Sequence, residues 1–235
     1  MTEAPTAPGT HAGPSAAAER PPRPAFVRRL WMVFVQPGEL FRALAQNPAW
    51  FPVAAFVALV AGASIFLLPA EAFESMWDNV PAEQREQMPE FPPGFMRAMT
   101  TAGTLVVTLI FPVAISLGTY VIFVFIRGDR ATFRQHLCVN AHTGLIMALG
   151  ALFLFPLRMR SLDFQQSLSI GSFFPFLPEG FAADLLAGLD LFGLWSCIVA
   201  GIGLAAIDER RSAKSTATIL VGVLVLFAVI RALFF

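Results

Sequence analysis

The sequence has little charge, little cysteine and a single lysine. Only 14% of its 235 residues are charged, against about 25% in an average soluble domain, and the basic and acidic residues balance to a formal net charge of zero. Nothing in that balance suggests a nucleic-acid partner. The two cysteines and three histidines form no CxxC or Cys/His cluster, which argues against a zinc site or a disulfide framework.

Common catalytic motifs are missing as well. The sequence contains no GxSxG, no HExxH and no Walker loop. We therefore expect a protein that is not an enzyme and that binds no cofactor or metal.

Apolar residues are abundant instead. They make up 56% of the chain, and the mean hydropathy is +0.67. Runs of about twenty apolar residues are long enough to cross a bilayer as helices. The sequence predicts an all-α membrane protein whose membrane domain, residues 49–235, is a bundle of five transmembrane helices. The expected spans are 49–68, 101–126, 137–155, 185–207 and 216–235.

The N-terminal part of the chain divides into two segments. Residues 1–24 are rich in Pro and Ala without apolar periodicity, which predicts a disordered tail and not a cleavable signal peptide. Residues 25–48 predict one or two amphipathic helices in the membrane interface, held by aromatic and basic side chains. A helix that binds a cytosolic partner is the alternative. The expected interfacial residues are Arg28, Arg29, Trp31, Phe41, Arg42 and Trp50.

The basic residues also predict an orientation. Eleven of the sixteen Lys and Arg fall in the N-terminal segment and in the second-to-third and fourth-to-fifth connections. By the positive-inside rule, the N-terminus is cytoplasmic and the C-terminus lies outside.

One acid, Asp190, stands in the predicted span 185–207. A carboxylate at the bilayer centre costs about 2.5–3.5 kcal/mol, so we expect it to face protein or water. It either fixes packing by hydrogen bonding to a neighbouring helix or contacts a ligand. On a continuous helix Cys197 and Gly201 share its face, and Gly193, Cys197 and Gly201 repeat every four residues as a close-packing seam.

Spans two and three carry further polar residues. A weakly polar side of span two is marked by Thr104, Thr108, Ser116 and Thr119, and Pro112 predicts a kink there that is either a hinge or static. In span three, Asn140 and Gly144 form a packing stripe, and His142 lies on nearly the opposite face. Asp190, Asn140, His142, Thr108 and Ser116 are the candidate polar core or transport residues.

Three segments together resemble the Yip1 domain family, and its bacterial branch in particular: QPGELFRALAQNPAWFPV, GDRATFRQHLCVNAH and LDLFGLWSCIVAGIGLAA. The likeness covers about residues 26–230. It implies an N-in, C-out five-helix bundle in a bacterial inner membrane. Eukaryotic members associate with one another and with prenylated Rab-type GTPases. The Asp-Leu-Tyr-Gly-Pro motif of many such members is absent here, so the resemblance does not carry GTPase binding over.

Two functions remain open from the sequence. The first is a non-enzymatic scaffold or adaptor that self-associates, recruits partners or shapes the bilayer. The second is a small transporter or channel for a cation, proton or small solute, using Asp190 and the polar residues of spans two and three. The small-residue seams predict a homo-oligomer or a membrane-protein partner.

Overall fold

A computed structural model describes residues 23–73, 81, 83, 92, 94–163, 166–208 and 210–234. Almost all of the predicted N-terminal tail lies outside this range. The described residues are helical apart from turns and one isolated antiparallel bridge between Ser169 and Asp190. The fold class is therefore the all-helical one that the sequence predicts.

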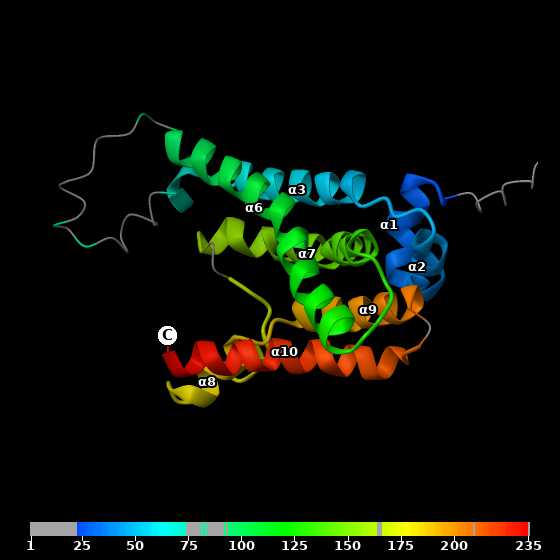
Figure 1. Ribbon diagram of the computed structural model, residues 1–235. Coiled ribbons are helices and arrows are strands. Elements are labelled where there is room, and N and C mark those ends of the chain that lie inside the picture. Colours follow the sequence, from blue (N-terminus) through cyan, green and yellow to red (C-terminus); the bar gives the residue numbers. More distant parts are fainter. Residues whose placement is uncertain are drawn as a thin grey trace, which may run out of the picture.

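Five apolar helices build the body of the protein (Figure 1). They are α3 (Phe51–Phe66), α6 (Phe95–Tyr120) with its π-helical continuation η1 (Val121–Ile126), α7 (Phe133–Ser161), α9 (Leu191–Ile207) and α10 (Ala213–Phe234).

Three of these helices, namely α6 with η1, α7 and α10, are long and apolar enough to cross a membrane. The other two have 16 and 17 residues, so they reach about 24 and 26 Å against the ~30 Å of a hydrocarbon core. Apolar helices of this kind make the chain an integral membrane protein, whereas the count of five spans stays a prediction.

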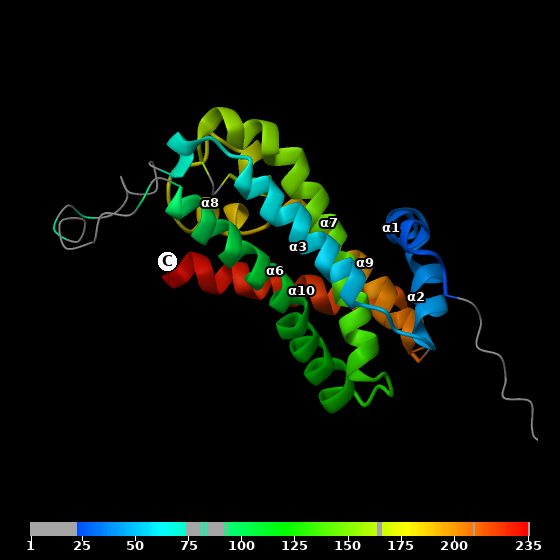
Figure 2. The same ribbon diagram turned by 90° about the horizontal axis from the view of Figure 1, so that it is seen from above.

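Helix α7 lies at the centre of the bundle (Figures 1 and 2). It packs against α3 and α6 on one side and against α9 on the other, and α9 in turn packs along α10. The stretch from His136 to Thr143 is buried without interruption. A helix buried on all sides needs apolar or hydrogen-bonded residues all round, and α7 accordingly shows no single polar face.

Two short helices, α1 (Phe26–Val35) and α2 (Pro37–Ala45), cover one end of the bundle. Pro37 occupies the first turn of α2, where its missing N–H costs nothing. Phe26 of α1 meets Phe56 of α3 with ring centroids 6.0 Å apart, and Phe34 meets Trp195 of α9 at 5.8 Å. The two helices thus pack directly on the end of the bundle, and their place in the membrane interface stays a prediction.

Two residues predicted to face the interface are buried inside the protein. Phe41 is 0% exposed, with its ring edge-on to His142 at 6.1 Å between centroids. Arg29 is 4% exposed and donates from Nη1 to the Ala49 carbonyl over 3.1 Å. Burial lowers the pKa of Arg29, and the positive charge of Arg23 adds to that effect. Neither side chain can contact lipid headgroups here.

The other predicted interfacial residues do reach the surface. Trp31 is 66% exposed, Arg28 and Arg42 are also exposed, and Trp50 is half-buried edge-on to Phe51.

The predicted fourth span, residues 185–207, is wrong as one continuous helix. It contains the end of α8 (Phe181–Ala187), a break at Gly188–Asp190 and then α9. Asp190 is the N-cap of α9, and its carboxylate accepts a 2.8 Å hydrogen bond from the Gly193 N–H. Aspartate favours this position because it satisfies a backbone donor that the helix leaves unpaired.

Backbone hydrogen bonds to residues 168–170 stabilise the break between α8 and α9. The Ile170 N–H donates to the Leu189 carbonyl and the Leu191 N–H to the Leu168 carbonyl, each over 2.9 Å. A segment distant in sequence therefore supplies the hydrogen bonds that a continuous helix would have made. Elsewhere α6 begins at Phe95 and α7 continues through Pro156 to Ser161, both beyond the predicted limits.

Candidate functional site

A cavity of about 550 Å³ lies in the middle of the bundle, and all five apolar helices line it. We call it the central cavity. Its floor is α7 between Asn140 and Ala151, and α6 lines another side from Val107 to Ile122. Residues of α3, α9 and α10 complete it. Most lining residues are apolar, and the polar ones are Thr108, Thr119, Asn140, Thr143 and Ser196.

A buried hydrogen-bonded cluster joins α6 to α7 beside this cavity. The Asn140 side-chain amide donates to Ser116 Oγ over 3.0 Å and to Thr119 Oγ1 over 3.1 Å. Those hydroxyls donate onward to backbone carbonyls of α6, Ser116 to Pro112 and Thr119 to Ser116. Both oxygens thus act as acceptors for Asn140, and the cluster fixes how the two helices meet.

His136 belongs to the same cluster. Its Nδ1 lies 3.0 Å from Thr119 Oγ1. The two atoms share one hydrogen bond, whose donor is set by the tautomer of His136. The sequence analysis marked Thr119 as part of the polar side of span two but missed His136, which lies one helical turn before Asn140 and so shares its face.

Pro112 sits on α6 next to this cluster and is buried. It has no N–H for the Thr108 carbonyl, and Thr108 lines the cavity. Ser116 bonds the Pro112 carbonyl one turn later over 2.5 Å, and the helix closes with the π-helical turn η1. Whether Pro112 acts as a hinge stays a prediction.

His142 is separate from this cluster. It is fully buried on the other side of α7, against Phe41, and its Nδ1 donates to the Cys138 carbonyl over 2.7 Å. With the proton on Nδ1, Nε2 is an acceptor, and it has no partner among the described residues.

Asp190 stands apart as well, at the N-cap of α9. The structure therefore brings Thr108 and Asn140 to the cavity, bonds Ser116 to Asn140 beside it, and leaves His142 and Asp190 elsewhere.

The predicted packing glycines lie at helix contacts of different kinds. A Cβ added to Gly201 would collide with the backbone of Ala217 on α10, whereas one on Gly144 would meet Val57 of α3 at an ordinary 3.6 Å. A Cβ added to Gly193 would meet only its own cap residue, Asp190, at 3.7 Å, and Cys197 lines the cavity. The contacts of Gly201 and Gly144 are thus made inside one chain, and association of the seam with a second copy stays a prediction.

An ionic clasp joins two loops at the end of the bundle near α2. Arg211 Nε lies 2.5 Å from Asp129 Oδ1, and its Nη2 donates to the Arg127 carbonyl over 2.5 Å. The Arg130 N–H donates to Asp208 Oδ2, again over 2.5 Å. The loop between η1 and α7 is thereby tied to the loop between α9 and α10. Sequence reasoning treated these residues only as charges for orientation and missed the pairing.

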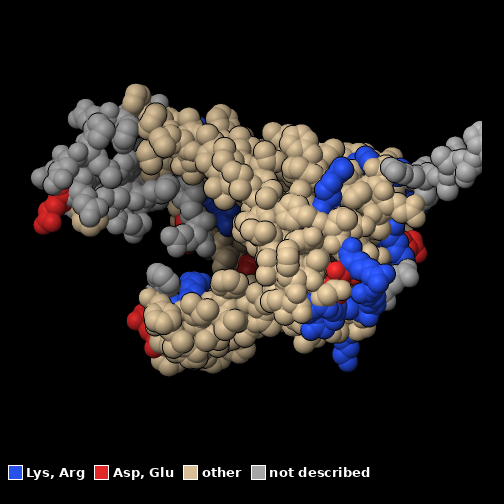
Figure 3. Space-filling model, viewed as in Figure 1, with Lys and Arg blue, Asp and Glu red and all other residues tan. Residues whose placement is uncertain are grey.

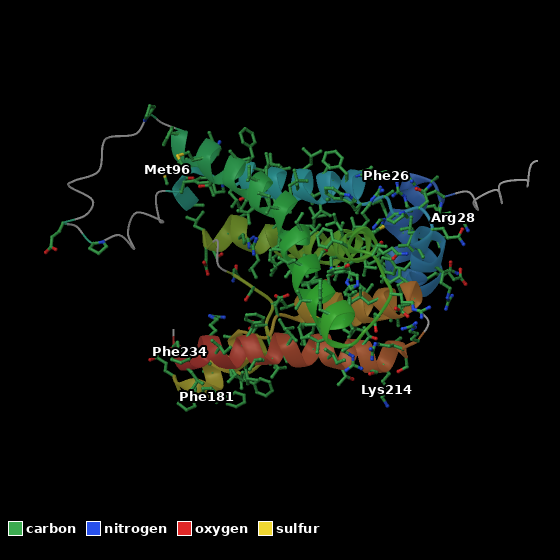
Figure 4. All side chains as sticks on the ribbon, viewed as in Figure 1. Phe26, Arg28, Met96, Phe181, Lys214 and Phe234 are labelled. Atoms are coloured by element: carbon green, nitrogen blue, oxygen red, sulfur yellow. The ribbon has the colours of Figure 1, made fainter. Side chains whose placement is uncertain are left out.

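Charge is distributed unevenly along the bundle axis (Figure 3). Lys and Arg gather at the end that carries α1, α2 and the clasp, which we call the basic end, and Figure 4 labels Arg28 and Lys214 there, with Phe181 and Phe234 at the opposite end. The described residues of the basic end include these cations: Arg23, Arg28, Arg29, Arg42, Arg127, Arg130, Arg134, Arg210, Arg211 and Lys214. Its described acids are Glu39, Asp129 and Asp208.

The family is identified by a match that covers nearly the whole chain. A family model, the Yip1 domain, matches residues 31–233. The chain belongs to the Yip1 domain family. No curated protein and no solved structure matches it. Among the described residues, no group of three or more His, Cys, Asp or Glu could hold a metal ion. The Yip1 match covers every helix that lines the central cavity and the clasp.

Proposed function

We propose that this Yip1-domain protein is a non-enzymatic scaffold of the bacterial inner membrane. It spans the membrane five times with the N-terminus in the cytoplasm and the C-terminus outside, associates with further copies of itself, and recruits partners at its basic end. The observation that supports this most directly is the combination of charge and rigidity at that end.

The basic end is built as a fixed platform. Leu40, Phe41 and Leu44 of α2 are at most 1% exposed, so the helix is anchored in the bundle while Glu39 and Arg42 face outward. The clasp holds the neighbouring loops, whose cations are exposed at Arg127 and Arg130. A rigid surface with excess positive charge suits an acidic partner surface and agrees with a cytoplasmic location.

Cross-linking in cells tests the scaffold role. A photo-reactive amino acid placed at Arg42, on the exposed face of α2, is expected to trap a partner protein and a second copy of the chain. The same residue at Val106, on the lipid-facing side of α6, serves as the control. A protein that is strictly monomeric in mild detergent and yields no cross-linked protein from Arg42 would overturn the proposal.

The central cavity favours transport as a second candidate function, but for an apolar solute. A path for cations or protons needs polar groups in sequence across the membrane, and the lining is nearly all apolar. Liposomes containing the wild type, compared with empty vesicles over a panel of apolar solutes, test this candidate. Equal flux in both excludes it.

A further inference from the structure

We propose that the central cavity binds one acyl chain of a phospholipid, and that the phosphate of this lipid lies beyond the cavity between Arg158 and Arg231. This site is distinct from the basic end, so it stands or falls independently of the scaffold role.

The lining of the cavity selects an apolar occupant. An ordered water needs about two to four polar partners, and of the polar residues in the lining Asn140, Thr143 and Ser196 are already engaged within the protein. Asn140 donates to α6, Thr143 Oγ1 donates to the Asn140 carbonyl over 3.0 Å, and Ser196 Oγ donates to the Thr143 carbonyl over 3.4 Å. An unfilled void of this size would deprive its lining of dispersion contacts, so a hydrocarbon occupant is favoured.

The size of the cavity is that of a small-molecule site. Its volume of about 550 Å³ lies within the ~300–1,000 Å³ of typical ligand pockets, and the molecule present in excess within a bilayer is lipid.

The cavity opens to lipid between α6 and α10. Val107 and Phe111 on α6 and Phe227 on α10 line it, yet they are 63%, 57% and 65% exposed. Residues that are both lining and exposed mark the rim of an opening. In the bundle this rim faces the hydrocarbon region, so an acyl chain can enter sideways without leaving an apolar environment.

Two arginines continue the cavity walls towards the end of the bundle opposite the basic end. Arg158 follows Ala151 by seven residues on α7, which places it on the same face about 10 Å further on. Arg231 follows Phe227 by four residues on α10, about 6 Å further on. Figure 3 shows a hollow at this end with Lys or Arg surface on both sides. Guanidinium groups in such positions suit a phosphate ester.

Two carboxylates offset the positive charge of Arg158 and Arg231. Asp163 and Asp190 lie within electrostatic reach of Arg158, and Arg158 also donates from Nη2 to the Gln166 carbonyl over 2.8 Å. Two cations and two carboxylates leave the hollow close to neutral. A zwitterionic headgroup such as phosphoethanolamine therefore fits better than a multiply charged anion.

Photo-cross-linking locates the chain directly. The full-length protein is placed in nanodiscs containing phosphatidylethanolamine with a diazirine in one acyl chain. We expect adducts on Ala141, Thr143 and Ala200, which line the cavity but are only 1%, 4% and 5% exposed. Annular lipid reaches only outward-facing residues such as Leu59, which is 63% exposed. Adducts confined to outward-facing residues would overturn the proposal.

A matched pair of substitutions tests occupancy. Gly144→Leu places its first atom in ordinary contact with Val57 and fills the cavity, whereas Gly222→Leu on α10 meets open space. We expect Gly144→Leu to lower the phosphatidylethanolamine retained through detergent gel filtration by about tenfold, equivalent to about 1.4 kcal/mol, and Gly222→Leu to leave it unchanged. Equal retention by the two variants would overturn the site.

Two further variants test the cavity and the headgroup site separately. Ala151→Phe blocks the cavity from another position if Gly144→Leu does not fold, as judged by its thermal transition. Arg158→Gln combined with Arg231→Gln is expected to weaken retention of phosphatidylethanolamine but not of diacylglycerol with the same chains. An equal effect on both lipids would remove the arginines from the proposal and overturn its headgroup part.

Discussion

Gly203 of α9 lies against the edge of the Phe41 ring of α2, at its Cδ2 and Cε2 atoms. A Cβ added at Gly203 would come within 2.7 Å of Phe41 Cδ2 and 2.8 Å of Val139 Cγ1 on α7. Three helices therefore meet at a point where only glycine fits. The absence of a side chain at Gly203 allows Phe41 of α2 to be buried in the bundle.

Gly203→Ala is expected to destabilise the protein by about 1–3 kcal/mol, since overpacking a rigid contact costs about this much. In an open helix the same change is normally stabilising by up to about 1 kcal/mol. Gly222→Ala, where the added Cβ meets nothing within 4 Å, is the matched control. Reversible unfolding in mixed micelles measures both. Equal stabilities would show that α2 does not depend on this contact.

The clasp between Asp129 and Arg211 is expected to be energetically coupled. The Asp129 side chain is only 7% exposed, so Arg211→Gln leaves a carboxylate with a poorer partner and costs about 1–3 kcal/mol. Asp129→Asn combined with Arg211→Gln should cost less than the sum of the two single changes. Additive costs in this double-mutant cycle would mean that the ion pair contributes nothing of its own.

Asn140→Ala tests the cluster that joins α6 to α7. The change removes two interhelical hydrogen bonds, and such bonds in membranes average about 0.6 kcal/mol with a maximum near 1.7. We therefore expect a loss of about 1–3 kcal/mol from the free energy of unfolding. Thr108→Ala is a suitable comparison on the same cavity wall. A larger loss for Thr108→Ala than for Asn140→Ala would contradict the assignment.

Asp190 is expected to behave as a helix cap. Asp190→Ala should cost about 0.5–2 kcal/mol, whereas Asp190→Asn should be nearly neutral because asparagine caps equally well. Hydrogen exchange at the Gly193 amide should accelerate in the alanine variant alone, since this N–H donates to the carboxylate. A strong defect in Asp190→Asn would instead point to a need for the negative charge.

The orientation can be tested by labelling. In a background with Cys138 and Cys197 replaced by serine, a cysteine at Arg42 should react with an impermeant reagent only after the cytoplasmic side is opened. A cysteine at Phe234 should react in intact cells with a permeable outer membrane. The reverse pattern would invert the topology, and reaction of both from one side would rule out an odd number of spans.

Apolar run length was enough to predict the helical class, because a stretch of twenty apolar residues has few other stable forms in a membrane. The family resemblance was likewise recoverable, and the Yip1 match covers residues 31–233. The break at Asp190 was not, because it depends on Leu168 and Ile170, which reach Leu189 and Leu191 from another part of the chain. Local sequence gives no measure of such distant pairing.

In the candidate site, too, local sequence predicted some residues and missed those that depend on distant contacts. Asn140 and Ser116 could be predicted because polar residues in apolar spans need hydrogen-bond partners. The Asn140 amide supplies the donor, and the Ser116 hydroxyl oxygen supplies the acceptor. The burial of Phe41 and Arg29 was missed because an amphipathic helix shows an apolar face without showing what covers it. Gly203, the residue that admits Phe41, lies far away in sequence.

The shortness of α3 and α9 has a consequence for the surrounding membrane. Their 16 and 17 residues stand beside the 29 of α7 and the 22 of α10, so the apolar girdle is not of uniform height. Lipids adjoining α3 or α9 must compress or tilt, at a fraction of a kcal/mol per ångström of mismatch. A protein with helices of such unequal length is therefore expected to favour thinner or more pliable patches of bilayer.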